Sequence, residues 1–167
     1  FCMLETIDEA VMFFARYLQS DRATHRLADL TGATPAGAAA LVAQHLGVCL
    51  DACHAAVQFE SASAIVARLR AAAIPIGKVQ LSSGLRLPQV DAAARRALLP
   101  YLDEVYLHQV VERRGDTLTR FLDLPDALEA MQASERMPPP EWRIHFHVPV
   151  FMERMRSFNS TQPFLRE

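Results

Sequence analysis

Short apolar runs alternate with helical segments along this chain. The apolar runs predict strands at six places, near residues 1–5, 46–51, 76–82, 104–111, 117–122 and 142–150. Between several of them, apolar side chains recur every three or four residues behind a capping residue such as Ser61 or Asp91, which predicts amphipathic helices. Strands that alternate with helices are typical of βαβ units, so we expect an α/β fold with a parallel sheet.

The segments 104–111 and 117–122 interrupt this alternation. Arg114-Gly115-Asp116 predicts a turn between them, so the two strands are expected to form a hairpin. With 167 residues the chain can bury a sizeable core, and we expect one domain over residues 1–167. A closed (β/α)8 barrel usually needs about 250 residues, which leaves part of a barrel or a smaller open sheet.

The overall composition argues against two kinds of partner, nucleic acids and membranes. The chain is 51% apolar and 22% charged, and its formal net charge is −2, so we expect neither nucleic acid as a partner nor insertion into a membrane. No apolar run reaches the roughly 18 residues of a membrane-spanning helix. The odd number of cysteines (Cys2, Cys49 and Cys53) favours reduced thiols in a cytoplasmic protein, where they are expected to act as small core residues.

Three of the apolar runs deliver side chains that are common metal ligands. They lead to Glu5, to Asp51 with His54 three residues later, and to His145 and His147. In parallel α/β folds the functional groups lie at the carboxyl ends of the strands. A carboxylate beside an imidazole suits a divalent ion such as Zn, Mn or Mg. The alternative is that Asp51 caps the following turn while His54 is exposed.

The spacing of the two later histidines predicts a shared face. His145 and His147 are two residues apart on a strand, so both should project from one face while Ile144 and Phe146 point the other way. The alternative is that one of the imidazoles is a core residue bonded to a backbone carbonyl. Glu5 would add a second carboxylate, or else it stabilises the N-terminus of the next helix.

Further polar residues on predicted strands are candidates for substrate binding. They are Lys78, Gln80 and His108. Each could instead be a solvent-facing polar residue. The sequence contains no P-loop, no Gly-x-Gly-x-x-Gly and no Gly-x-Ser-x-Gly, which argues against the common nucleotide and acyl-transfer sites.

Several segments spread over nearly the whole chain form a recognisable set. They are Met3-Leu4-Glu5-Thr6, Gly47-Val48-Cys49-Leu50-Asp51-Ala52-Cys53-His54, Gly77-Lys78-Val79-Gln80-Leu81-Ser82-Ser83, Tyr106-Leu107-His108-Gln109-Val110-Val111-Glu112, Trp142-Arg143-Ile144-His145-Phe146-His147-Val148-Pro149 and Ser160-Thr161-Gln162. Together they resemble the EboE-type metabolite traffic proteins of the xylose-isomerase-like TIM barrel superfamily. The resemblance implies a partial (β/α)8 barrel, roughly strands 5 to 7 with a hairpin insertion, whose remaining strands lie outside this segment.

The resemblance also implies roles for particular residues. Glu5, Asp51 and His54 match the superfamily's metal-ligand positions, and Glu5 and His54 are the expected catalytic residues. Where the superfamily usually has a histidine ligand on its seventh strand, this chain has Gln80. His108, His145 or His147 would then replace that ligand.

The resemblance gives an expected function as well. It is metal-dependent isomerisation or epimerisation of a small metabolite, in the processing or traffic of secondary metabolites. The alternatives are a non-catalytic protein that binds and transfers a metabolite, and a metal-dependent hydrolase. A cut barrel would expose strand edges, so the isolated chain is also expected to aggregate.

Overall fold

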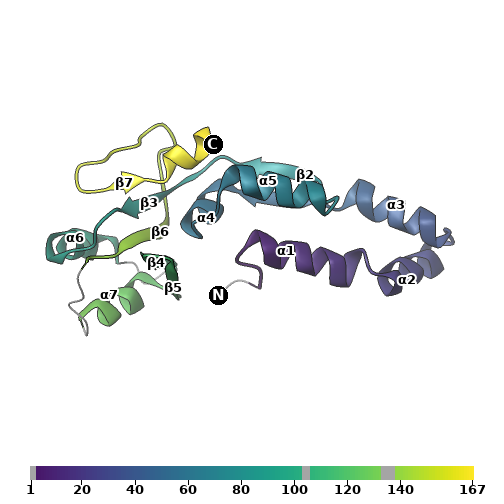
Figure 1. Cartoon of the computed structure of the whole chain (residues 1–167), viewed down its shortest axis with the longest axis horizontal. Helices are drawn as coiled ribbons and strands as arrows, with labels where there is room; N and C mark the ends of the chain where they lie inside the picture. Colours follow the sequence, from purple (N-terminus) through teal and green to yellow (C-terminus); the bar gives the residue numbers. More distant parts are fainter. Residues whose placement is uncertain (1–2, 103–105, 133–137) are drawn as a thin grey trace. The chain divides into compact units, whose positions relative to one another are not determined.

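The computed structural model describes residues 3–102, 106–132 and 138–167 (Figure 1). This part of the chain folds into two compact units. The helical unit comprises the residues up to Leu50 together with Glu60–Gln80, and the sheet unit comprises Asp51–Phe59 together with Leu81–Glu167. None of the helices in the described segments is long and apolar enough to cross a membrane.

The helical unit consists mainly of helices in its described residues. The elements are α1 (Ile7–Phe13), a π-helical turn η1 (Phe14–Leu18), α2 (Asp21–Thr31), α3 (Pro35–His45), β1 (Val48–Asp51), α5 (Ala62–Ala71) and β2 (Ile76–Gln80). Asp51, the last residue of β1, belongs to the sheet unit. β1 and β2 form a small parallel pair, which confirms the predicted parallel pairing at this one place. Gly47 permits the close approach of the two chain segments at the start of this pair, because a Cβ there would lie 2.5 Å from the carbonyl oxygen of Pro75.

Capping residues set where the helices of this unit begin. Thr6 and Glu9 form a capping box, in which the Thr6 side chain accepts from the Glu9 N–H and the Glu9 carboxylate accepts from the Thr6 N–H. Pro35 occupies the first turn of α3, where its fixed φ suits a helix, and Ser61 caps α5. The predicted strand at 1–5 is wrong in its described residues, because Met3–Glu5 form no strand and lead into this cap.

The sheet unit contains most of the strands. Its elements are α4 (Ala52–Val57), β3 (Ser83–Leu87), α6 (Ala92–Leu98), a 3₁₀ turn η2 (Leu99–Tyr101), β4 (Val110–Arg114), β5 (Thr117–Phe121), α7 (Leu124–Gln132), β6 (Glu141–Val148), β7 (Asn159–Ser160) and a 3₁₀ turn η3 (Gln162–Arg166). Among the described residues, five strands form one sheet in the order β5-β4-β6-β3-β7.

Every neighbouring pair of strands in this sheet is antiparallel. The predicted partial TIM barrel is therefore wrong, because the strands of such a barrel are all parallel. The error comes from the segment after β2. The sequence predicts that Ser82-Ser83-Gly84 ends a strand, but Ser83–Leu87 is itself strand β3, which lies between β6 and β7.

Other strand predictions agree better with the structure. The hairpin is confirmed, since β4 and β5 pair around Gly115, whose φ of 55° suits a glycine in a tight turn. β4 begins only at Val110; residues 104 and 105 of the predicted strand lie outside the described residues, and so does Cys2. The last predicted strand, 142–150, corresponds to β6.

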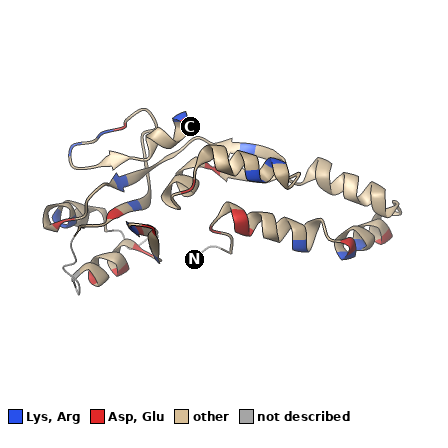
Figure 2. Ribbon diagram, in the orientation of Figure 1, with Lys and Arg blue, Asp and Glu red and all other residues tan. Residues whose placement is uncertain are grey.

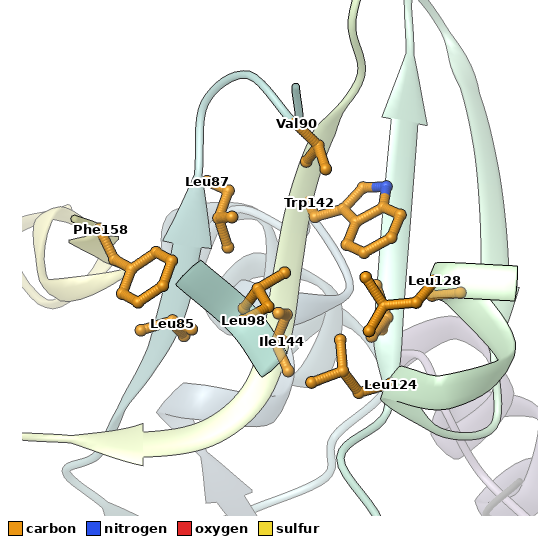
Figure 3. Packing of buried hydrophobic residues seen from close by; sticks show 11 residues of the cluster. Leu85, Leu87, Val90, Leu98, Leu124, Leu128, Trp142, Ile144 and Phe158 are labelled. Atoms are coloured by element: carbon orange, nitrogen blue, oxygen red, sulfur yellow. The ribbon is translucent and has the colours of Figure 1, made fainter. Parts of the chain in front are cut away.

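The two faces of the five-stranded sheet differ in character. One face is apolar and packs against α6 and α7, with Trp142 and Ile144 of β6 beside Leu85 and Leu87 of β3 (Figure 3). The other face carries Arg143, His145 and His147 of β6. Because side chains alternate along a strand, the same eight residues of β6 supply both the core and a row of polar groups.

Candidate metal centre

Strand β6 places two imidazoles side by side. His145 and His147 lie on the same face, as predicted, with their rings stacked at 23° and their centroids 5.3 Å apart. Their Nε2 atoms are 3.3 Å apart. Two imidazole nitrogens bound to one tetrahedral Zn²⁺ would be separated by about 3.3 Å, given bonds of about 2.0–2.1 Å. The spacing of the pair therefore fits one shared ion.

Helix α4 brings a thiol to the same place. Cys53 lies in its first turn and is fully buried. The helix can approach the sheet this closely because Gly84 of β3 has no side chain: a Cβ there would lie 3.1 Å from the Cys53 Sγ and 3.0 Å from Val57 Cγ2. Gly84 thus makes room for the thiol beside β6.

These three side chains form a group with the geometry of a metal site. One ligand atom from each of Cys53, His145 and His147 lies within 4.8 Å of the other two. The thiol is buried, His145 is partly buried and His147 is exposed. Among the described residues this group could hold a metal ion, with solvent able to reach it from the His147 side.

Asp51 stands at the start of α4 and is charged. Its carboxylate caps the helix by accepting from the N–H groups of Cys53 and His54, at 2.9 and 3.2 Å, and it also accepts from the Ser82 hydroxyl at 2.8 Å. Burial by itself would raise the pKa of Asp51, but these hydrogen bonds and the charge of His145 lower it below 3.8. Asp51 therefore caps α4, which is the alternative role that the sequence left open for it. Its negative charge also lies close to the imidazole of His145.

Burial has the opposite consequence for the thiol. It raises the pKa of Cys53 from 9.0 to about 12, and the negative charge of Asp51 adds to the effect. The thiol is accordingly neutral at physiological pH in the metal-free chain. A metal ion must displace its proton, because the thiolate is the form that binds metals.

His54 also belongs to this neighbourhood. Its ring centroid lies 5.6 Å from that of His145, with the planes tilted by 56°. The structure thus brings four of the predicted residues together in the sheet unit: Asp51, His54, His145 and His147. Cys53 joins them as a candidate ligand, although the sequence predicts only a core role for it.

The other predicted site residues are not members of this group in the described structure. Glu5 precedes α1 in the helical unit, where its backbone N–H donates to Glu9 at 2.7 Å. Lys78 and Gln80 lie on β2 of the same unit, and the Lys78 ammonium donates to the Gln80 side chain at 3.4 Å. His108 is in the sheet unit, but it is buried against Phe146, which lies on the opposite face of β6 from His145.

The residues around Cys53 give a sequence signal by which this candidate ligand could have been found. Cys53 stands among Ala52, Ala55 and Ala56, and such a run of small residues is typical of a helix packed closely on its neighbour. The sequence predicts that Gly84 lies at the end of a strand, so the space that it leaves for α4 becomes evident only from the pairing of β3. Comparison with known proteins finds no matching family model, no matching curated protein and no matching solved structure. The resemblance to EboE-type proteins stays a prediction.

Proposed function

We propose that the sheet unit binds one divalent transition-metal ion through Cys53, His145 and His147, and that this ion activates a bound water or a small metabolite. The observation that carries the proposal is the convergence of one thiol and two imidazoles within 4.8 Å. These ligands come from an α-helix and a β-strand that are packed together, so the backbone holds them in place before any ion binds.

The ligand types favour zinc among the ions predicted from the sequence. Thiolate and imidazole suit Zn²⁺, whereas Mg²⁺ and Mn²⁺ prefer carboxylate, carbonyl and water oxygens. Asp51 adds a nearby negative charge that favours any cation. Three protein ligands and a solvent-accessible side are typical of catalytic zinc sites, in which the fourth position takes water or substrate.

The arrangement suggests a division of roles among the side chains. Cys53 and the two histidines would hold the ion, and Asp51 fixes the start of α4. His54, whose ring lies beside that of His145, would be the candidate general base. When bound, a zinc ion at such a site lowers the pKa of its water to near 7 and polarises carbonyl oxygens. This ligand set favours metal-dependent hydrolysis of a small metabolite.

Isomerisation or epimerisation of a small metabolite would use the same centre differently, since it needs a base to move a proton between carbon atoms while the ion polarises the neighbouring oxygens. Its predicted carboxylate, Glu5, belongs to the helical unit. The hydrolase is supported by the ring contact between His54 and the proposed ligand His145.

Metal analysis tests the proposal on the full chain. After dialysis against Zn²⁺, we expect about one equivalent of zinc in the wild type and a loss of most of it in Cys53→Ala and His147→Ala. Cys49→Ser is the matched control, because Cys49 is an exposed thiol on β1 and should leave the zinc content unchanged. Equal zinc in the wild type and in both ligand variants would contradict the proposal.

A further inference from the structure

The polar face of the five-stranded sheet carries a row of arginines. The strand register sets Arg86 of β3 opposite Arg143 of β6, and Arg113 of β4 opposite Glu141 of β6. Figure 2 shows one basic residue on β3 and, on the neighbouring strand β6, an acidic residue followed by a basic one. Residues directly opposite one another in a sheet share a face, so these four side chains lie on the side that also bears the metal group.

One carboxylate is shared by three guanidinium groups. Glu141 accepts from Arg86 Nε at 2.7 Å, from Arg113 Nη2 at 2.5 Å and from Arg143 Nε at 3.2 Å. Burial would raise the pKa of Glu141, but the three arginines lower it, so the carboxylate is ionised at neutral pH. The cluster then holds three positive charges against a single negative one, and this excess of positive charge favours a further anion.

An aromatic ring fixes two of the arginines. The guanidinium carbons of Arg143 and Arg113 lie 4.0 and 4.4 Å from the centroid of the Phe59 ring. Phe59 reaches this position with a φ of 60°, a conformation that costs a non-glycine residue energy. The surrounding packing therefore holds the ring beside the arginines despite that cost, and the guanidinium groups are ordered in advance.

Two of the arginines keep donors that an anion can use. Arg143 is mostly buried and also donates to the carbonyl oxygen of Ala56 at 2.6 Å, so it mainly supplies charge. The side chains of Arg86 and Arg113 are 31% and 40% exposed, and within the described residues their hydrogen bonds go to Glu141 alone. A guanidinium has five N–H donors, so most of theirs are left for a ligand.

We propose that Arg86, Arg113 and Arg143 form a binding site for an oxyanion, either a phosphate or a carboxylate group. Guanidinium groups bind both through paired N–H···O bonds, and this geometry is the reason for arginine rather than lysine at such sites. The site is separate from the metal group and needs no metal ion.

The position of the site also bears on the ligand of the metal centre. Arg143 and His145 are alternate residues on one face of β6, which places their Cα atoms roughly 7 Å apart. A small anionic metabolite could therefore contact the arginines with one end and the ion with the other. This link rests on the function proposed above, whereas the anion site itself does not.

Titration of the metal-free full chain with inorganic phosphate tests the site. In ¹⁵N-labelled wild type we expect the Nε–Hε resonances of Arg86 and Arg113 to shift with phosphate, while that of Arg96, an exposed residue of α6, stays in place. In Arg86→Gln/Arg113→Gln we expect phosphate to bind at least tenfold more weakly, and in Arg96→Gln as tightly as in the wild type.

A parallel titration with malonate separates the two sources of oxyanion. Tighter binding of phosphate supports a phosphorylated ligand, and tighter binding of malonate supports a carboxylate ligand. If neither probe shifts the two arginine resonances, or if the double variant binds phosphate as well as the wild type, the proposal is overturned. Because no zinc is present, these outcomes are independent of whether the metal centre exists.

Discussion

Gly84 and Cys53 depend on each other at the contact between β3 and α4. The thiol needs space directly above the strand, and only a residue without a side chain provides it. His145 and His147 share a face because side chains alternate along β6, so their placement side by side could be predicted from their spacing in the sequence. The cysteine could not, because its position depends on a glycine 31 residues away in the sequence.

Substituting Gly84 should disturb the metal group through this contact. In Gly84→Ala the new methyl group would lie about 3 Å from Ile144 O, Val57 Cγ2 and Cys53 Sγ, so α4 must move away. We expect a loss of about 1–3 kcal/mol in the free energy of unfolding and weaker zinc binding. Denaturant unfolding and zinc titration measure both. Gly77→Ala is the control, because its nearest atom would be 3.9 Å away, and a change there of under about 1 kcal/mol is expected.

The raised pKa of Cys53 predicts a dependence of stability on pH. Between pH 9 and about 12 the folded, metal-free chain keeps the thiol proton while the unfolded chain releases it. Stability should therefore be fully present below pH 9 and fall above it, by at most about 1.4 kcal/mol per pH unit. Unfolding measured at a series of pH values should show this decline in the wild type and in Cys49→Ser. A decline of equal steepness in Cys53→Ala would contradict the assignment.

At the scale of elements, the sequence predicted local structure better than pairing. The helix starts at Pro35, Ser61 and Asp91, and the hairpin around Gly115, follow from capping and turn residues that act within a few positions. The strands that pair with β3 and β6 are distant in the sequence. Nothing in the residues of either strand indicates whether it pairs parallel or antiparallel with its neighbours. The prediction of a parallel sheet rests on the order of elements, and that order is also compatible with the antiparallel sheet observed.

Asp51 caps the N-terminus of α4. Substitutions can separate the effect of this cap on stability from the effect of the carboxylate charge on zinc binding. Asn caps a helix as well as Asp does, so Asp51→Asn should change the free energy of unfolding by only a few tenths of a kcal/mol at pH 7, whereas Asp51→Ala should lose about 1 kcal/mol. Both variants lack the negative charge beside His145, so zinc should bind more weakly to each. Denaturant unfolding and zinc titration separate the two effects. If Asp51→Asn bound zinc like the wild type, the carboxylate charge would play no part in the site.

At the scale of the whole molecule, the division into two units predicts where a ligand acts. All three proposed metal ligands belong to the sheet unit. An ion that binds the folded state stabilises the unit that holds it by mass action, and different parts of a protein can have different local stabilities. We expect zinc to slow amide hydrogen exchange in α4, β3 and β6 and to leave α1 and α2 unchanged. Equal protection in both units would show that they unfold as one.

In the proposed metal centre one thiol and two imidazoles share an ion. X-ray absorption at the zinc edge, on the full chain loaded with one equivalent, measures that coordination shell directly. We expect one sulfur ligand at about 2.3 Å and two imidazole nitrogens at about 2.0–2.1 Å, with the sulfur absent in Cys53→Ala. A wild-type shell made only of nitrogen and oxygen, or the same sulfur signal in Cys53→Ala, would contradict it.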